Sequence, residues 1–498
     1  MKITLWFLGV AFLGVALLPY WLFRQNELPA GTNLRSPSFE FRDARLLIDR
    51  TIWDAQAERS ILSHSIFDVM LQEIEAAETF VIADFFLWNP WLGGSEPRSE
   101  LRPLAQELAD ALIRKRICNP DMPILVITDP INRIYGDHAP EYFARMQEVG
   151  IPVVYTDLKE LPDSNLIYAP IARFWGKFLP SDKDDSRARI VPNPFDSEGK
   201  KLTIAQLGRL LYFKANHRKV LVTGYRQSLP RVLMGSLNPA DGSANHSNLA
   251  VLVAGAVAVY AAQSELAVAE WSAGEPLPVI AQIRGLLPSV ESLSKARSGL
   301  PSVAWRSEGA IRDELILQLN QAASGSRVDA AVFYFSDRKI IEAFKGAIKR
   351  GAQVRLLLDA NRDAFGREKN GIPNRIIAAE LMALARTAAI EVRWAATHGE
   401  QFHAKVLRVA GAQQDILCLG SANWTRRNLS NLNLEANLLF HDAPQLGLDF
   451  DTYFEALWTN GAAYEETLPY ADWSEQGWSL RWKTWLYRVQ EWSGASTF

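Results

Sequence analysis

Cysteine and net charge are both scarce in this sequence. The 498 residues include only two cysteines, Cys118 and Cys418. Their separation of 418 − 118 = 300 positions excludes a disulfide framework and a cysteine-rich zinc site, and we expect two buried thiols. The 53 basic and 56 acidic residues give a formal net charge of −3, which does not favour a protein that binds nucleic acid chiefly by electrostatic attraction.

The chain does contain enough apolar sequence for a large buried core. Hydrophobic residues make up 48% of it and charged residues 22%, a balance typical of a folded protein rather than a disordered one. At about 150 residues per domain, the length allows two or three domains.

The N-terminus carries a long apolar run. Residues 3–23 contain no charged side chain and are flanked by Lys2 and Arg24. As a helix this stretch would be roughly 31 Å long, enough to cross the hydrocarbon core of a bilayer. A cleaved signal peptide is the alternative, but the run is longer than the usual apolar region of a signal and no clear small-residue cleavage site follows it. We therefore predict a membrane anchor over residues 1–24, with a single pass and the catalytic body outside the cytoplasm.

The remaining chain contains a weak internal repeat. Helix-length segments alternate with short apolar runs, first around residues 66–129 and again around residues 311–359. This order predicts an α/β fold made of two similar sandwich halves. We expect a first half over residues 45–273, a linker over 274–309, a second half over 310–460 and a tryptophan-rich tail over 461–498.

Each half contains the same pair of short motifs. H-x-K occupies residues 217–219 and 403–405, and G-S-x-N follows at residues 235–238 and 420–423. The spacings from histidine to glycine nearly match, 235 − 217 = 18 and 420 − 403 = 17. In a strand, residues i and i+2 project from one face, so the histidine and lysine of each motif point into one site.

Two such sets facing each other would surround one anionic centre with imidazoles, ammonium groups and amides. That inventory suits covalent catalysis at a phosphodiester, in which one imidazole attacks phosphorus and the other protonates the leaving oxygen. The sequence shows no carboxylate cluster beside either histidine, so we expect no metal and no cofactor.

These motifs resemble the phospholipase D superfamily, whose signature is a duplicated H-x-K-x4-D followed by G-S-x-N. The resemblance covers roughly residues 45–460. The aspartate of that signature would fall at Gly224 and Ala410, which weakens a resemblance to the cardiolipin synthases in particular. A family acid that orients a catalytic histidine matches Glu435, and its counterpart in the first half is Asn248.

The resemblance implies a role for each motif residue. His217 would be the nucleophile and His403 the general acid and then the base, although spacing does not exclude the exchanged assignment. The phosphate would be bound by Lys219, Lys405, Asn238 and Asn423, with support from Ser236 and Ser421.

The same resemblance implies hydrolysis or alcohol exchange at a phosphodiester, through a phosphohistidine, with a membrane phospholipid as the expected substrate. The alternatives are a single-strand nuclease with Phe402 and Trp424 stacking bases, a cardiolipin synthase-like phosphatidyltransferase, and a non-catalytic scaffold. Nucleic acid is not the first choice of partner. No oligomer is required, because one chain holds both motifs.

The C-terminal tail is rich in tryptophan. Trp478, Trp482, Trp485, Leu486, Val489 and Trp492 fall near one face of a predicted helix, with basic residues between them. Two interpretations stay open: this face lies on a membrane, or it docks onto the core of the protein itself.

Overall fold

The structure is a computed structural model that describes most of the chain. It describes residues 27–494 except 42, 93–100, 137, 166–167, 170–188, 194–199, 298, 365–366, 386–388, 413 and 462–463. The predicted anchor over residues 1–24 lies outside the described residues. Within the described part, no helix is both long and apolar enough to cross a membrane.

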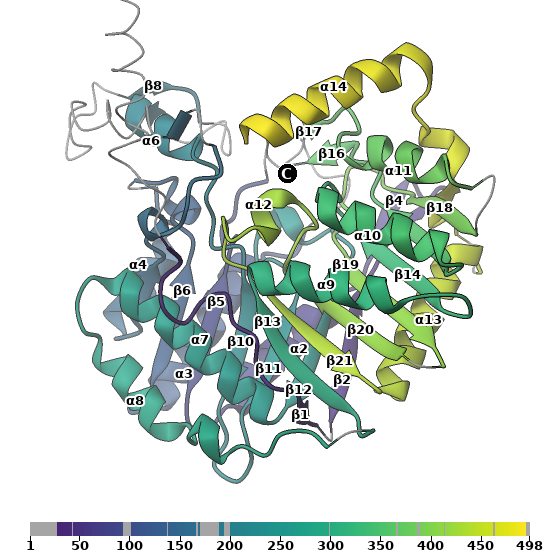
Figure 1. The fold of residues 1–498 in the computed structure, drawn as a ribbon. Coiled ribbons are helices and arrows are strands. Elements are labelled where there is room, and N and C mark those ends of the chain that lie inside the picture. Colours follow the sequence, from purple (N-terminus) through teal and green to yellow (C-terminus); the bar gives the residue numbers. More distant parts are fainter. Residues whose placement is uncertain are drawn as a thin grey trace, which may run out of the picture.

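Two β-sheets with the same strand order form the centre of the molecule (Figure 1). The first runs β2 (Ala44–Asp49), β12 (Asn248–Ala254), β11 (Arg231–Gly235), β10 (Lys219–Thr223), β5 (Val81–Phe85), β6 (Ile124–Thr128) and β7 (Val153–Tyr155). The second runs β1 (Phe39–Glu40), β13 (Ser302–Ser307), β21 (Ala436–His441), β20 (Gln414–Gly420), β19 (Lys405–Gly411), β14 (Arg327–Val332), β15 (Gln353–Leu358), β18 (Ile390–Ala395) and β22 (Thr467–Pro469). Taken across the sheet from β2 to β7, the strands of the first sheet correspond one by one to those of the second sheet taken from β13 to β18. The second sheet has β1 and β22 in addition, one at each edge. The predicted α/β duplication is therefore confirmed.

Helices cover each sheet in the same way. The first sheet packs against α2 (Ser65–Ala76), α3 (Leu104–Cys118) and α4 (Glu141–Glu148), and the second against α9 (Gly309–Gln321), α10 (Arg338–Lys349) and α11 (Asn374–Met382). A third core lies between the halves and takes side chains from both sheets and from α7 (Ala256–Ala273) and α13 (Pro444–Thr459). Each valine or leucine buried there contributes roughly 1.5–3 kcal/mol, so this shared core holds the halves in one fixed arrangement.

Smaller elements lie around these layers. They are β3 (Thr51–Asp54), β4 (Arg59–Leu62), β8 (Arg189–Val191), β9 (Leu202–Thr203), α6 (Ile204–Leu210), α8 (Pro278–Leu286), β16 (Asp363–Ala364), β17 (Arg367–Glu368), α12 (Arg426–Leu429) and α14 (Gly477–Ser493).

Two local expectations differ from the structure. The segment predicted as a linker contains β13, which pairs with β21 and buries Val303 and Trp305, so it supplies the counterpart of β2. Cys418 is buried as expected, but Cys118 is exposed because it stands at the last position of α3.

Candidate active site

The two H-x-K motifs lie where the halves meet. Their lysines begin the central strands β10 and β19, and their histidines stand two residues earlier. The backbone N–H of His217 donates to the carbonyl of Leu434 at 2.9 Å, and that of His403 donates to the carbonyl of Ser247 at 2.9 Å. Each motif is therefore fixed by a loop of the opposite half.

The side-chain partners of the histidines are also crossed between the halves. Nδ1 of His217 lies 2.8 Å from Oε1 of Glu435, and Nδ1 of His403 lies 3.1 Å from Oδ1 of Asn248. Glu435 immediately precedes β21 and Asn248 begins β12, at corresponding places in the two sheets. The predicted pairing of Glu435 with a catalytic histidine and the predicted correspondence to Asn248 both agree with this geometry.

The serines of the G-S-x-N motifs hold these partners in place. Ser421 Oγ donates to Glu435, and Ser236 Oγ donates to Asn248 Oδ1 at 2.9 Å. Ser421 binds Oε2 of Glu435, and Asn428 donates from Nδ2 to Oε1, the oxygen that also faces His217. The hydroxyls predicted to support the phosphate thus orient the residues behind the histidines.

Each lysine lies between its own histidine and a phenylalanine ring. Nζ of Lys219 donates to the His217 carbonyl at 2.8 Å and lies 5.2 Å from the ring centroid of Phe86. Nζ of Lys405 donates to the His403 carbonyl at 2.7 Å and lies 5.2 Å from the ring centroid of Phe333. The phenylalanines also pack on the histidine rings, with centroids 4.7 and 5.0 Å apart.

Burial lowers the pKa values of all four groups, and nearby positive charge lowers those of His217, His403 and Lys405 further. Burial, opposed by Glu435, lowers the pKa of His217 to about 4, and burial lowers that of Lys219 to about 7. Burial, and then nearby positive charge, lowers the pKa of His403 well below its usual value. Burial, and then the charge of Lys219, lowers the pKa of Lys405 well below its usual value in the same way. A phosphodiester anion between these groups would relieve the repulsion, so the site is prepared for negative charge.

The glycines and asparagines of the G-S-x-N motifs lie in tightly packed, buried positions. A Cβ on Gly235 would lie 2.3 Å from the Leu249 carbonyl oxygen, and one on Gly420 would lie 2.3 Å from that of Ala436. Asn238 and Asn423 are only 4% and 7% exposed, respectively. The Oδ1 atom of Asn423 is buried and accepts no hydrogen bond from the described residues.

Sequence reasoning missed a buried charged network behind His217. Arg218, fully buried, donates from Nη1 to Glu265 at 3.1 Å and from Nη2 to Glu308 at 2.7 Å. Oε1 of Glu308 also accepts from the backbone N–H of Glu435 at 3.1 Å. The second half has Ala404 at the position of Arg218, so only the first motif is braced in this way.

Two buried aspartates fix the backbone before the motifs. Asp129 accepts from the backbone N–H of Asn216 at 2.7 Å, and Asp359 accepts from that of Phe402 at 2.8 Å. Both follow a central strand, β6 or β15, and burial raises the pKa of Asp129 to about 7. A carboxylate at the end of an apolar strand in each half is the sequence signal that could have found them.

The structure also accounts for one departure from the family signature. A Cβ on Gly224 would lie 2.2 Å from Thr79 Oγ1 and 2.4 Å from the Phe80 ring. An aspartate at position 224 therefore has no room unless the neighbouring chain moves. Ala410 lies on β19, opposite Arg327 and Asp415.

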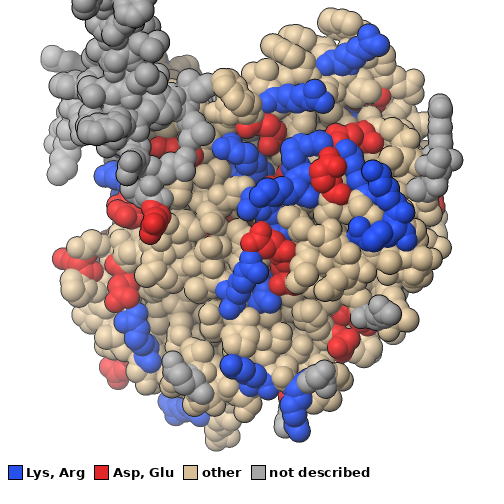
Figure 2. Space-filling view, viewed as in Figure 1, with Lys and Arg blue, Asp and Glu red and all other residues tan. Residues whose placement is uncertain are grey.

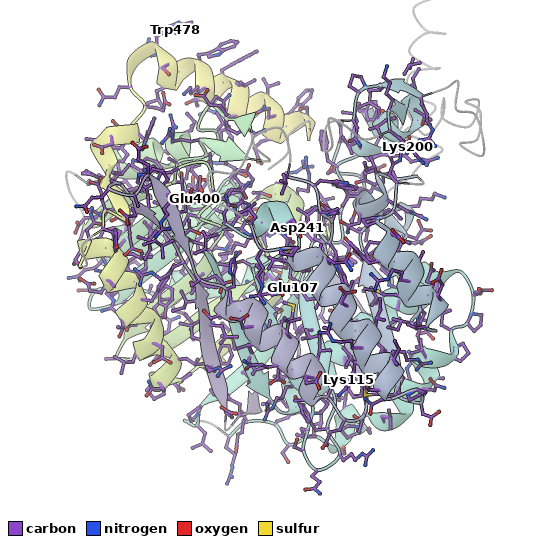
Figure 3. The ribbon with its side chains drawn as sticks, turned by 180° about the vertical axis from the view of Figure 1, so that it is seen from behind. Glu107, Lys115, Lys200, Asp241, Glu400 and Trp478 are labelled. Carbon is purple, nitrogen blue, oxygen red and sulfur yellow. The ribbon has the colours of Figure 1, made fainter. Side chains whose placement is uncertain are left out.

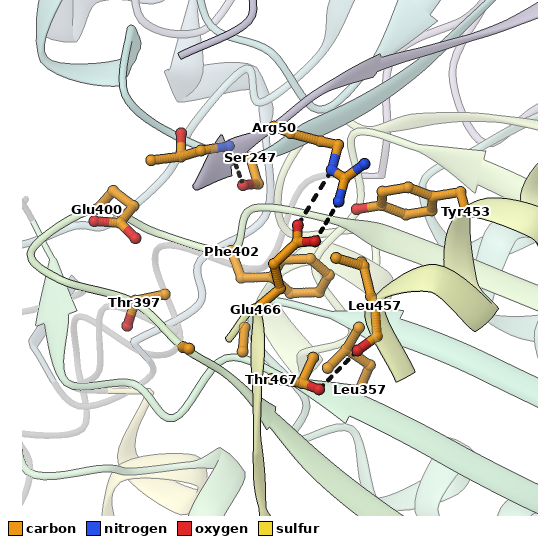
Figure 4. A pocket seen from close by; sticks show the side chains of 13 residues that line it. Arg50, Ser247, Leu357, Thr397, Glu400, Phe402, Tyr453, Leu457, Glu466 and Thr467 are labelled. Atoms are coloured by element: carbon orange, nitrogen blue, oxygen red, sulfur yellow. Dashed lines mark hydrogen bonds and ion pairs between the residues drawn. The ribbon is translucent and has the colours of Figure 1, made fainter. Parts of the chain in front are cut away.

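A small pocket lies beside the second histidine, between the halves (Figure 4). Its lining includes Ser247 and Phe402, each next in sequence to a site residue, together with Arg50 and Glu466. Nε of Arg50 donates to Glu466 at 3.2 Å, and the two side chains form an ion pair. The arginine is thus already neutralised, and the pair bridges the halves instead of offering an anion site.

The described residues contain no group of three or more histidine, cysteine, aspartate or glutamate side chains arranged to hold a metal ion. The aromatic residues predicted to stack bases are buried: Phe402 is 5% exposed and Trp424 is 1% exposed. Trp424 also packs edge-on against Phe335, so the base stacking considered for the nuclease alternative has no exposed ring at these two positions.

Comparisons with known proteins agree with this architecture. Residues 315–458 match a family model described as "Cardiolipin synthase, PLD-like domain". No protein of curated function matches the sequence. Phosphatidylserine synthase from Haemophilus influenzae Rd KW20 is 12% identical, with a TM-score of 0.55 over 92% of this chain and 96% of its own.

Two other solved structures are more distant. Polyphosphate kinase from Porphyromonas gingivalis is 10% identical with a TM-score of 0.42, over 80% of this chain and 47% of its own. The phospholipase D family member Nuc from Salmonella typhimurium is 20% identical with a TM-score of 0.26, over 32% of this chain and 95% of its own.

The fold and site define a duplicated α/β sandwich with one histidine and one lysine from each half at a shared site. Residues 315–458 match the phospholipase D-like family model, and the first half repeats their strand order and their H-x-K and G-S-x-N motifs.

Proposed function

We propose that this protein is a phosphodiesterase that transfers the phosphatidyl group of a membrane phospholipid to water or to an alcohol, through a phosphohistidine. The observation that carries the proposal is the crossed arrangement of His217 and His403, each oriented through Nδ1 by a residue of the opposite half. Orientation through Nδ1 leaves both Nε2 atoms for chemistry, as a two-histidine transfer requires.

In the first step, Nε2 of His217 attacks phosphorus. The bond between phosphorus and the leaving alcohol oxygen breaks, and His403 gives that oxygen its Nε2 proton. Lys219 and Lys405 stabilise the charge on the equatorial oxygens, and the amides of Asn238 and Asn423 donate to them. In the second step, water or an alcohol transfers a proton to His403 and attacks phosphorus, and the phosphorus–nitrogen bond breaks.

The lipid substrate is supported by the predicted anchor and by the family model, whose description names a lipid synthase. A nucleic-acid substrate has less support. On the face shown in Figure 2, basic side chains gather over the second half, but acidic side chains lie among them. The proposal includes attachment through residues 3–23 with the body outside the cytoplasm.

The test uses the detergent-solubilised full chain with EDTA and mixed-phospholipid vesicles, in parallel with short single-stranded DNA. We expect headgroup release that is lost in His217→Ala and in His403→Ala. A His441→Gln variant is the matched control, because His441 ends β21 at the opposite end of the strand from Glu435.

Phospholipid labelled at phosphorus should leave its label on His403→Ala after an alkaline quench, which preserves a phosphorus–nitrogen bond, and none on His217→Ala. Phosphatidic acid as the product would identify water as the acceptor, and a new phosphatidyl ester would identify an alcohol. DNA shortening with intact lipid would replace the proposal with a nuclease. Turnover that survives in both histidine variants would refute the assigned site.

A further inference from the structure

Helix α14 is attached to the second half by one of its faces. Tyr487 is buried, and its hydroxyl donates to the Ser336 carbonyl at 2.8 Å. Ser336 Oγ in turn donates to Glu491 at 2.8 Å, and Leu480 and Leu486 pack partly buried against the outer core of the second half. The helix is therefore held in a fixed orientation.

The tryptophans lie on the opposite face, which is directed away from the core and is partly to mostly exposed among the described residues. Trp478 is 78% exposed, Trp482 48%, Trp485 54% and Trp492 74%, with Val489 at 38% between the last two. Figure 3 shows Trp478 at the edge of the molecule, directed outward. Of the two interpretations left open by the sequence, docking of this face onto the core is wrong.

The exposed residues form one continuous stripe. Positions 478, 482, 485, 489 and 492 are spaced four, three, four and three residues apart, which keeps them on one side of a helix. Neighbouring rings stack, with centroids of Trp478 and Trp482 6.3 Å apart and those of Trp482 and Trp485 4.9 Å apart. Isolated exposed apolar residues are common on proteins, but a stripe of this length marks an interaction surface.

The charges on α14 suit an anionic lipid surface. Arg481 and Arg488 are exposed beside the stripe, whereas Lys483 pairs with Glu475. The helix has three basic residues and one acidic residue, Glu491, which faces inward to Ser336. Tryptophan is enriched at membrane interfaces, and a second copy of this helix would bring like-charged arginines together.

The stripe also lies at the catalytic end of the molecule. Arg427 in α12 donates to the carbonyl of Gly494, the residue after α14, at 3.1 Å. Residue Asn423 of the site lies three positions before α12, and Figure 1 shows α12 beside the C-terminal end of α14. Ser336, which binds the inner face of α14, is three positions after Phe333, whose ring packs on His403.

From these observations we propose that α14 is a membrane-docking helix, whose tryptophan stripe inserts into the interface of an anionic bilayer and sets the active-site end against the lipid. The part concerning lipid delivery rests on the proposed function. The insertion itself does not, because it follows from the exposure, spacing and charge of α14.

The first experiment measures insertion without turnover. In the full chain with Cys118→Ser, an environment-sensitive fluorophore is attached to Val489→Cys or, as a control, to Ile117→Cys on α3. Lys115, two residues before that control position, lies far from Trp478 in Figure 3. On phosphatidylcholine vesicles with 30% phosphatidylglycerol, we expect a blue shift and at least threefold protection from iodide quenching at position 489 only.

The second experiment measures delivery of lipid. Replacement of Trp478, Trp482, Trp485 and Trp492 by serine should lower kcat/KM on vesicles at least tenfold and leave turnover of bis(p-nitrophenyl) phosphate unchanged. The matched control replaces three exposed apolar residues elsewhere by serine: Ile117, Leu317 and Leu448.

The outcomes separate the two proposals. Equal iodide quenching at positions 489 and 117 on vesicles would overturn the docking helix. A blue shift at position 489 that appears without vesicles, when the protein concentration alone is raised, would overturn it as well. Unchanged vesicle turnover in the tryptophan variant of an active enzyme would overturn its role in delivery. Protection at position 489 with no lipid turnover would support the docking helix and count against the proposed function.

Discussion

Replacement of Asn248 by aspartate should reveal which histidine is the general acid. Asn248 Oδ1 lies 3.1 Å from Nδ1 of His403, so the substitution puts a carboxylate against that imidazole. The present neighbours of His403 oppose its protonation: burial lowers its pKa first, followed by the charges of Lys405, His246, Lys219 and His217. A carboxylate favours the imidazolium, so the change raises the pKa of His403.

The size of the effect follows from two opposing contacts. Two opposite charges 4 Å apart attract by about 4 kcal/mol at an effective dielectric constant near 20. Against this, Nδ2 of Asn248 donates to the His246 carbonyl at 3.0 Å, and an aspartate oxygen there would face another oxygen, which costs about 1–3 kcal/mol. The remaining 1–3 kcal/mol corresponds to roughly 10- to 100-fold in the protonated fraction of His403.

The assay is the pH dependence of single-turnover rates for wild type and Asn248→Asp. At a pH above both histidine pKa values, the rate follows the fraction of the general acid that is still protonated. If His403 is the acid, the variant should be about 10- to 100-fold faster at the alkaline end and unchanged at the acidic end.

If His403 is instead the nucleophile, the variant should be slower at the acidic end and unchanged at the alkaline end, because an attacking imidazole must be unprotonated. A folded variant with the wild-type profile at both ends would refute the electrostatic reasoning. Asn248→Leu, which removes the hydrogen bond without adding charge, separates loss of orientation from the effect of charge.

Three further substitutions test other parts of the site. Glu435→Gln removes the charge that raises the pKa of His217. We therefore expect the acidic end of the single-turnover rate profile to move to lower pH. The rate at neutral pH should fall about 100-fold or more. Lys405→Met should lower kcat/KM by about 100- to 1,000-fold through lost stabilisation of the equatorial oxygens, and a loss below tenfold would exclude its phosphate role. Gly420→Ala puts a Cβ 2.3 Å from the Ala436 carbonyl oxygen and should destabilise the fold by about 1–3 kcal/mol in denaturant unfolding. Gly285→Ala on α8, with no atom within 4 Å of its added Cβ, is the matched control and should be neutral or stabilising by up to about 1 kcal/mol.

The sequence predicted those parts of the site that depend on local spacing. The H-x-K and G-S-x-N motifs, the pairing of Glu435 with a histidine, and the duplicated α/β order all rest on patterns within short segments. The bracing of Arg218 by Glu308 joins residues 90 positions apart, and no local pattern indicates it. Phe86 and Phe333 were missed for the same reason, because their runs predict only buried strands.

The tryptophan stripe shows a different limit of sequence reasoning. Helical spacing predicts correctly that the tryptophans share a face, but it does not say whether that face is buried. The outcome depends on the other side of α14, where Tyr487 and Glu491 bind the backbone and side chain of Ser336. These two hydrogen bonds span 151 and 155 positions of sequence, and together with the packing of Leu480 and Leu486 they orient the helix.

The crossed histidine partners explain why the site needs both halves. Neither half alone contains a histidine with its orienting partner, since Glu435 serves His217 and Asn248 serves His403. The halves share one strand order but differ at this point, with a carboxylate behind one imidazole and a neutral amide behind the other. A carboxylate stabilises positive charge on its imidazole and an amide only fixes the tautomer, so the two histidines differ in proton affinity before substrate binds. Duplication supplies the paired geometry, and the difference between Glu435 and Asn248, together with the Arg218 network behind His217, makes the surroundings of the two histidines unequal.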